Sequence, residues 1–334
     1  MSGSPAVRIA PAKLNLTLAV LGRRADGYHA LHSIMAPLDL ADRLSVAPAI
    51  GPTDTLHVDG ADCGPADGNL VLRAIAAARA AVRAELGPAA TAGALAARLE
   101  KRIPVAAGLA GGSSDAAAAI DAALEAWCVD PGAAARHAAA VSVGSDVAFF
   151  QAGGWALVEG RGEHVARIPS VRGAAPAVLV VTPAVAVSTP AVFAAWSGGA
   201  RAAGWGSAAA ASRHLADELR GGMTARALIV RAGILVHAND LMPAAQHVVP
   251  ALVGFRRGLI RTLGTAVGQS GSGPTCWVIY PSREDADAAA AAVRDALADG
   301  RIVAPGDAPP AVHVASLVLD RPVATDAGEE GSDT

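Results

Sequence analysis

The sequence predicts a mixed α/β protein of the α+β class with two domains, and three observations support this prediction. Apolar and polar residues alternate over residues 7–20, which is the period of a strand. A glycine loop at residues 104–114 precedes a long alanine-rich segment, which favours a helix. Near the C-terminus, residues 266–280 indicate two strands around a glycine turn. The length of 334 residues suits about two domains, each with its own core.

In the first half, caps and helix breakers separate the expected elements. Asn69 suits the N-cap of a helix that Gly87-Pro88 ends. Strands are expected at residues 7–20, 31–40, 43–48, 94–101 and 154–158, and helices from Asn69 to about Glu85, from Ser114 to about Trp127 and from Pro131 to about Gly144. Periodicity breaks at residues 168–176, so we expect the first domain to cover residues 1–170.

The second half favours several helices and then a small sheet. The expected elements are a strand at residues 177–181, helices at 189–196, 208–220 and 224–231, a helical stretch at 239–263 interrupted by Pro250, two strands within 266–280, a helix at 283–299 and a strand at 312–319. Two strands around a turn, then a helix and a strand, are typical of a ferredoxin-like unit. We expect this domain to cover residues 171–322, and the acidic residues 323–334 to form a disordered tail.

Composition narrows the class of protein. The formal net charge of −3 gives no reason to expect binding to nucleic acid or to an anionic membrane. The three cysteines (Cys63, Cys128 and Cys276) lack the spacing of a metal site, and their odd number argues against a disulfide framework. The N-terminus has no apolar signal segment, and no stretch suggests a membrane span. We therefore expect a cytoplasmic protein whose oligomeric state the sequence does not set.

The scarcity of lysine draws attention to two positions. Of the 27 basic residues only Lys13 and Lys101 are lysines, and all the others are arginines. Such a chain should keep lysine where a compact ammonium matters more than a planar guanidinium, although two lysines could also survive by chance. Lys13 shares one face of the first predicted strand with Asn15 and Thr17. A lysine and an asparagine side by side favour a site over a solvated surface.

The glycine loop is the most informative segment of the chain. Its three glycines can adopt positive φ and let a ligand approach the backbone, and Ser113 or Ser114 is expected to cap the helix that follows. Free N–H groups at a helix N-terminus favour an anion, so the loop can bind phosphate, although a plain connector is an equally good interpretation. If the loop binds phosphate, a valine at Gly111 should occupy the space of a phosphate oxygen.

Other polar clusters allow two interpretations each. Asp146 is expected at a helix start, where it is either a cap or a buried carboxylate that accepts a proton or orients a hydroxyl. Residues 268–273 form either a hairpin turn or a second backbone site for phosphate. Tyr28 and His29 lie in a polar loop, where each alone would be an ordinary surface or packing residue.

These motifs, taken in order, resemble those of the GHMP kinases. The phosphate motif of that family, Pro-x-x-x-Gly-Leu-x-Gly/Ser-Ser-Ser/Ala-Ala, is similar to Pro104–Ala116, which begins with the same Pro-x-x-x-Gly-Leu-x-Gly and is two residues longer. The chain is most similar to the bacterial members of non-mevalonate isoprenoid biosynthesis, whose motifs correspond to Pro11–Leu16, Arg24–His29, Gly144–Val147 and Gly271–Gly273. The resemblance covers about residues 7–320. It implies an ATP domain like domain 2 of ribosomal protein S5, followed by a ferredoxin-like C-terminal domain.

The resemblance also implies roles for individual residues. Lys13 and Asp146 correspond to the catalytic lysine and carboxylate, and Ser114 would lie near Mg²⁺ or the β- and γ-phosphates. The implied ATP-binding loop comprises Pro104, Val105, Ala106, Ala107, Gly108, Leu109, Ala110, Gly111, Gly112, Ser113 and Ser114, and the implied substrate-binding residues are Asn15, Tyr28, His29 and Phe193. Many relatives have glycine at the position of Ala110, where a methyl group is tolerable if φ is negative. Residues 200–235 match no motif of the family.

The function implied by the resemblance is phosphorylation of an alcohol. We expect ATP and Mg²⁺ as cofactors, and a cytidine-diphosphate-linked sugar alcohol, phosphorylated at its 2-hydroxyl, as the small-molecule substrate. A kinase with a smaller acceptor, such as homoserine or mevalonate, is the first alternative, and Asp26–His29 argue against it because such a kinase has no evident need for them. A non-catalytic nucleotide sensor is the second, and it is disfavoured because Lys13 and Asp146 are both present.

Overall fold

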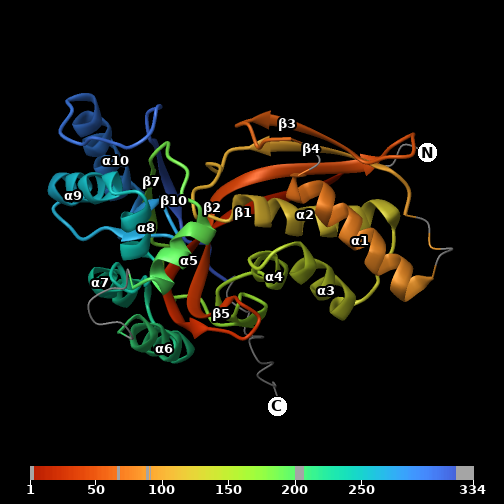
Figure 1. Ribbon diagram of the computed structural model, residues 1–334, viewed down its shortest axis with the longest axis horizontal. Coiled ribbons are helices and arrows are strands. Elements are labelled where there is room, and N and C mark those ends of the chain that lie inside the picture. The colour runs from red at the N-terminus through yellow and green to blue at the C-terminus, as the bar shows by residue number, and fades with distance from the viewer. Residues whose placement is uncertain (1–3, 66–67, 88–89, 91, 200–206, 321–334) are drawn as a thin grey trace, which may run out of the picture.

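The structure is a computed structural model, and it describes residues 4–65, 68–87, 90, 92–199 and 207–320. A large, strongly curved sheet occupies one side of the molecule and a smaller sheet with its helices the other (Figure 1). The predicted tail at residues 323–334 and the start of the stretch without a family match, residues 200–206, lie outside the described residues.

The large sheet is built around one very long strand. Strand β2 pairs with β1 along one edge, while β4 and β5 pair with successive parts of its other edge. All pairs are antiparallel except β3 with β4. The strands are β1 (Ala6–Arg23), β2 (His29–Pro48), β3 (Thr55–Gly60), β4 (Leu95–Lys101), β5 (Ala156–Gly160) and β6 (His164–Arg167).

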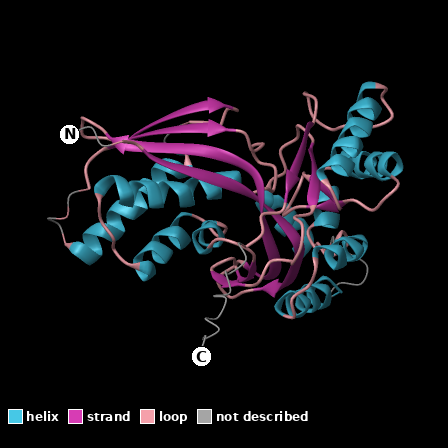
Figure 2. Cartoon of the chain, turned by 180° about the vertical axis from the view of Figure 1, so that it is seen from behind, coloured by secondary structure: helices cyan, strands magenta, loops and turns pink. Residues whose placement is uncertain are grey.

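Helices cover one face of this sheet (Figure 2). They are α1 (Leu70–Leu86), α2 (Gly111–Trp127), α3 (Ala133–Val143) and α4 (Val147–Ala152). The Asn69 side chain caps α1 as predicted, because its Oδ1 accepts a hydrogen bond from Val71 N at 2.9 Å. Helix α2 is buried along most of its length, and its alanines let it pack closely between the sheet and α1. Its N-terminus is thereby held at a fixed place beside the end of β4.

The small sheet has the ferredoxin-like arrangement that the sequence predicts. Its order is β10-β7-β9-β8 with all pairs antiparallel, and helices connect β7 to β8 and β9 to β10. The strands are β7 (Ala177–Thr182), β8 (Gly268–Gln269), β9 (Cys276–Tyr280) and β10 (Ala311–Ser316). The helices are α5 (Thr189–Ser197), α6 (Ser207–Arg220), α7 (Ala225–Leu235), α8 (Met242–Val248), α9 (Ala251–Leu263) and α10 (Arg283–Ala298).

The structure corrects the sequence analysis at several elements. The two strands expected at residues 31–40 and 43–48 are one continuous strand, β2. Strands β3 and β6 were not predicted; both are short and have few fully buried residues, so their apolar pattern is weak. The break predicted at Pro250 does separate α8 from α9.

The two halves are joined by more than the connecting chain. Leu18 of β1 forms a parallel bridge with Asn239, and Leu38 of β2 forms an antiparallel bridge with Leu317. One apolar cluster includes buried residues of both sheets. The domain boundary predicted near residue 170 falls between β6 and β7 and stays a prediction.

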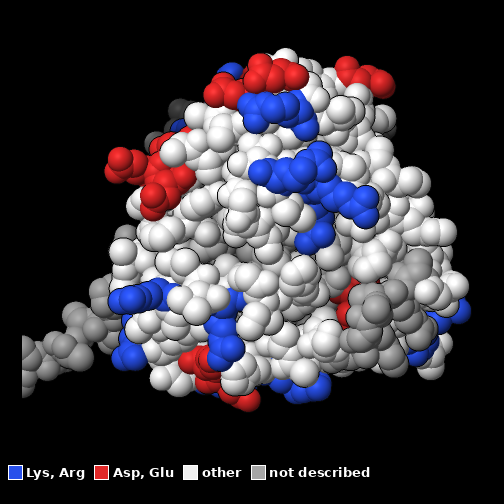
Figure 3. Space-filling view, turned by 90° about the vertical axis from the view of Figure 1, so that its left-hand side faces the viewer, with Lys and Arg blue, Asp and Glu red and all other residues white. Residues whose placement is uncertain are grey.

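The surface carries charges of both signs on the same face. Figure 3 shows the side of the molecule that carries α9 and α10, where one group of Lys and Arg side chains lies near the middle and others adjoin acidic side chains near the top and the bottom. Within the described residues, no helix is both long and apolar enough to cross a membrane.

Candidate active site

A cavity of about 570 Å³ lies between the two halves of the molecule. Its walls come from β1, the glycine loop, the turn at residues 270–273 and helix α5. Of the residues predicted for the site, those lining the cavity are Lys13, Asn15, Pro104, Val105, Ala106, Ala107, Gly108, Ala110, Gly111, Gly112, Ser113, Asp146 and Phe193. Leu109 and Ser114 are buried behind the wall, and Tyr28 and His29 lie outside the lining.

The backbone of the glycine loop has an unusual conformation. Three alternate residues, Ala106, Gly108 and Ala110, have φ values of 54°, 79° and 54°. Alternation of left-handed residues with others turns successive N–H groups toward one side, as in anion-binding nests. Gly108 must be glycine, because a Cβ there would lie 2.9 Å from Gly273 O. The loop therefore has the geometry that a phosphate site needs.

Two expectations for this loop were wrong. The methyl group of Ala110 was expected to be tolerable because φ would be negative, but φ at Ala110 is positive. The residue that caps α2 is Ala110, without a side-chain hydrogen bond, and both Ser113 and Ser114 lie inside the first turn. The helix starts three residues earlier than predicted because two glycines, Gly111 and Gly112, form its first turn despite their low helix propensity.

The conformation of Ala110 leads to a stability prediction. An L-residue in the left-handed region costs about 1–2 kcal/mol, whereas glycine has a higher entropy when unfolded. Ala110→Gly should therefore stabilise the protein by up to about 1 kcal/mol in urea unfolding. Cys128→Gly is the matched control, because Cys128 has a φ of 55° at the other end of α2. Destabilisation by Ala110→Gly, with stabilisation by the control, would contradict the assignment of strain.

The expected effect of a valine at Gly111 also needs correction. A Cβ at Gly111 would lie 2.9 Å from Lys101 Nζ and 3.0 Å from Ile103 Cγ2, so it points into the protein and not toward a ligand. A branched side chain there would disturb the packing under the loop before it met a phosphate. A loss of ATP binding in Gly111→Val would therefore not by itself indicate a phosphate site.

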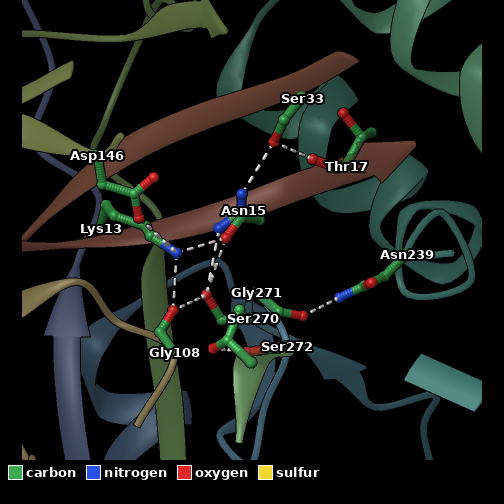
Figure 4. A network of polar contacts seen from close by, with 11 residues as sticks. Lys13, Asn15, Thr17, Ser33, Gly108, Asp146, Asn239, Ser270, Gly271 and Ser272 are labelled. Carbon is green, nitrogen blue, oxygen red and sulfur yellow. Dashed lines mark hydrogen bonds and ion pairs between the residues drawn. The ribbon is translucent and has the colours of Figure 1, made fainter. Parts of the chain in front are cut away.

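Lys13 is buried at the centre of the site (Figure 4). Its Nζ donates hydrogen bonds to Asn15 Oδ1 at 2.6 Å and to Gly108 O at 2.7 Å. The register of β1 with β2 shifts on both sides of Lys13 and Asn15, an irregularity that often aims side chains at active sites. Burial lowers the pKa of Lys13, and the nearby Asp146 carboxylate opposes this effect.

Asn15 connects Lys13 to its surroundings. Its Nδ2 donates to Ser33 Oγ at 2.8 Å, and its Oδ1 accepts from Lys13 and, more weakly, from Ser270 Oγ at 3.4 Å. Ser270 Oγ also donates to Gly108 O at 3.0 Å. Asn15, predicted from the family to bind substrate, therefore also positions the lysine and links β1 to the turn at residues 270–273.

The turn at residues 270–273 lies against the glycine loop. Asn239 holds it in place, because its Nδ2 donates to Gln269 O and Gly271 O at 2.9 Å each. A Cβ at Gly271 would be 3.1 Å from Gly108 O and 3.4 Å from Lys13 Nζ, so the two glycine segments are packed together around the lysine. Of the two interpretations of residues 268–273, the second backbone site for phosphate stays a prediction.

Asp146 faces Lys13 from the start of α4 (Figure 4). Its Oδ2 lies 3.9 Å from Lys13 Nζ, and the side chain is 31% exposed. Its carboxylate makes no side-chain capping hydrogen bond to α4, so the interpretation of Asp146 as a helix cap is not supported. A cavity-facing carboxylate beside a buried ammonium can accept a proton from a bound hydroxyl.

Two of the three aromatic residues predicted to bind the substrate, His29 and Phe193, contact each other. The rings of His29 and Phe193 are stacked with centroids 4.9 Å apart, and His29 Nε2 lies 2.8 Å from Ser197 Oγ. Tyr28 is half exposed, with the Arg161 guanidinium 5.2 Å from its ring centre. The structure thus brings His29 and Phe193 together and leaves Tyr28 outside this contact.

Comparison with known proteins shows which family this chain belongs to. The model of the GHMP kinases N terminal domain matches residues 69–154, and that of the GHMP kinases C terminal matches residues 230–299. A 4-diphosphocytidyl-2-C-methyl-D-erythritol kinase of Deinococcus radiodurans is 37% identical over 85% of this chain and 87% of its own length. The chain belongs to the GHMP kinase family. It is thereby a small-molecule kinase.

Other relatives of this GHMP kinase support the assignment. A protein of the same name from Methylorubrum extorquens is 40% identical over 86% of this chain and 94% of its own length. One from Pelotomaculum thermopropionicum is 46% identical, but the match spans only 53% of its length. A crystal structure of 4-(cytidine 5'-diphospho)-2C-methyl-D-erythritol kinase has a TM-score of 0.65 at 30% identity, with 93% and 99% of the two chains covered. A homoserine kinase of Cytophaga hutchinsonii has the same TM-score at 18% identity, which shows the fold alone.

The buried hydroxyl group of Ser114 tests whether the residues of this kinase fit a Mg²⁺ ion. The Ser114 Oγ is buried and has no hydrogen-bond partner among the described residues. Those residues also contain no group of three or more His, Cys, Asp or Glu side chains that could hold a metal ion. The unpaired Ser114 hydroxyl is compatible with Mg²⁺, which in kinases takes most of its oxygen ligands from phosphates and water.

Sequence analysis missed several residues of the site. Lys101 and Asp115 line the cavity close to the glycine loop, and Asn239 supports the turn opposite. The scarcity of lysine was a usable signal for Lys101. Asp115 lies within the motif segment Pro104–Ala116, which was a usable signal for it, whereas no local signal could have found Asn239, because its importance depends on contacts with a distant segment.

Proposed function

We propose that this GHMP kinase transfers the γ-phosphoryl group of ATP to the 2-hydroxyl of 4-diphosphocytidyl-2-C-methyl-D-erythritol. The pair of Lys13 and Asp146 is the observation that carries the proposal, because it lies in one cavity with the glycine loop and Phe193. The relatives that cover most of the chain bear the name of this kinase. The reaction would belong to non-mevalonate isoprenoid precursor biosynthesis in the cytoplasm.

Each part of the site has a role in the proposed reaction. Phosphoryl transfer depends on positioning and on neutralisation of charge more than on covalent help from the protein. The N–H groups of the glycine loop would bind the triphosphate, and the Lys13 ammonium would stabilise negative charge on the transferred group. Asp146 would orient the acceptor hydroxyl and take its proton as the new O–P bond forms. When bound near Ser114, Mg²⁺ would neutralise phosphate charge.

The proposal predicts a narrow choice of acceptor. In an ADP-release assay with ATP, we expect turnover of 4-diphosphocytidyl-2-C-methyl-D-erythritol and little or none of free methylerythritol phosphate, mevalonate or homoserine. A site that hydrogen-bonds a base should reject analogues without it by about 10⁴-fold. Efficient turnover of mevalonate or homoserine, with no response to the cytidyl compound, would overturn the proposal.

Phe193→Ala tests the base end of the substrate separately. Stacking of a base on an aromatic ring contributes about 1–3 kcal/mol, so the KM for the cytidyl substrate should rise about tenfold or more. The KM for ATP should change little, because Phe193 belongs to helix α5 and not to the glycine loop. Phe150→Ala serves as control, since this ring packs in the helical layer away from Phe193. Equal effects of the two variants would argue against stacking.

A further inference from the structure

Three charged side chains form a buried cluster under the glycine loop. Lys101 Nζ donates to Asp115 Oδ2 at 2.8 Å and forms a second, shorter hydrogen bond to Asp42 Oδ2. The three side chains are at most 4% exposed. We refer to Asp42, Lys101 and Asp115 as the Lys101 cluster. Nothing in the proposed reaction uses it.

The cluster joins three elements at the two ends of the loop. At the entry, Asp42 Oδ1 on β2 accepts hydrogen bonds from Arg102 N at 2.5 Å and Ile103 N at 2.8 Å. At the exit, Asp115 belongs to the second turn of α2. Lys101, the last residue of β4, bridges the two carboxylates. Two ionic contacts of one ammonium therefore fix the start and the end of the glycine loop relative to each other.

The cluster also touches the loop itself. Lys101 Nζ lies only 2.9 Å from the place that a Cβ of Gly111 would occupy, and both Lys101 and Asp115 line the cavity. A shift of the ammonium or of Asp115 would therefore move the first turn of α2. That turn supplies free N–H groups, whose positions decide how well a polyanion is held.

We propose that Asp42, Lys101 and Asp115 are positioning residues that hold the glycine loop in its anion-binding conformation and thereby set its affinity for the ATP triphosphate. The inference rests on the proposed function only in assigning ATP to the loop. It requires no statement about the acceptor.

Burial and mutual contacts shift the pKa of two members of the Lys101 cluster. Burial raises the pKa of Asp115, and Asp42 raises it further, against the effect of Lys101. Burial lowers the pKa of Lys101, but the two carboxylates outweigh this effect and hold it above its usual value. Lys101 therefore remains a cation that bridges the other two side chains.

Three variants test the inference by calorimetric titration with a non-hydrolysable ATP analogue and Mg²⁺, together with steady-state kinetics. Lys101→Met removes the bridge, and Asp115→Asn removes one charge at constant size. Asp54→Asn is the matched control. Asp54 also pairs with a cation, Arg79, at 2.7 Å and accepts a hydrogen bond from Leu95 N at the start of β4, but it does not line the cavity.

We expect Lys101→Met to raise the Kd for the analogue about tenfold or more, with a smaller change in kcat at saturating ATP. Asp115→Asn should raise that Kd by a smaller factor, because its amide oxygen can still accept a hydrogen bond from Lys101 but carries no charge. Asp54→Asn should lower the Tm and leave the Kd unchanged. If Lys101→Met does not fold, the Kd of Asp115→Asn tests the inference instead. The amide of this variant keeps the packing and leaves Lys101 paired with Asp42.

Two results would overturn the inference. One is that the cluster variants lose stability, as Asp54→Asn does, while the Kd for the analogue stays that of the parent. The other is a Kd that rises as much in Asp54→Asn as in Lys101→Met. Failure of the proposed function would look different, since ATP binding would remain intact and no acceptor in the panel would be phosphorylated.

Discussion

The Asp146→Asn variant should bind ATP like the parent chain and turn over about a thousandfold more slowly. An amide has nearly the size of a carboxylate but cannot accept the proton of the acceptor hydroxyl. Asp146 is 31% exposed and makes no capping hydrogen bond, so its replacement removes no structural contact of α4. We therefore expect the Tm to stay within about 1 °C of the parent value, as for most surface substitutions.

The measurement is ADP release at saturating ATP and cytidyl substrate, with the Tm and ATP affinity determined on the same sample. Asp130→Asn is the control, because this exposed carboxylate accepts from Gly132 N before α3 and lies outside the cavity. Near-normal turnover of Asp146→Asn would show that the carboxylate does not take the proton.

Much of the fold was predictable because its signals are local. Asn69 caps α1, Pro250 separates two helices, and the strand-turn-strand pattern around residues 266–280 belongs to the small sheet. Strand β3 was missed because it lies at the sheet edge and pairs only with β4, so that few of its side chains are fully buried. A weak burial pattern leaves a weak sequence pattern.

The two lysines show what composition can contribute to a site. Both Lys13 and Lys101 are buried, and each makes two short hydrogen bonds next to the glycine loop. Their rarity in an arginine-rich chain was therefore informative for both. Their partners could not be predicted, because Gly108 is 95 residues from Lys13 and Asp42 is 59 residues from Lys101.

Backbone conformation was the second feature of the site that the sequence alone could not predict. The sequence shows an alanine at position 110, but the sign of its φ depends on how the loop is fixed between β4 and α2. Likewise, Gly111 is recognisable as a glycine, whereas the direction in which a side chain would point is set by Lys101 and Ile103 beneath it. Residue types predicted which segment forms the site, and tertiary contacts determine what each position in it tolerates.

Lys13→Met should reduce turnover by about a thousandfold, comparable to removal of a donor from a preorganised transition-state site. Methionine has a similar volume but neither charge nor donor, so in the proposed mechanism the transferred phosphoryl group would lose the ammonium that stabilises its negative charge. The fold should survive, because Ser270 Oγ still donates to Gly108 O and lies near Asn15 Oδ1. Removal of a buried charge also ends its desolvation cost, the effect that lowers the pKa of Lys13.

Two further variants test whether the loss of turnover in Lys13→Met is specific to the side chain at this position. Lys13→Arg keeps the charge, but the planar guanidinium needs more room than Gly108 and Gly271 leave around the ammonium, so most activity should still be lost. Lys101→Met should reduce turnover at saturating ATP far less than Lys13→Met, because Lys101 acts through the loop and not on the reacting atoms. If Lys101→Met abolishes turnover under these conditions while Lys13→Met does not, the roles of the two lysines are reversed.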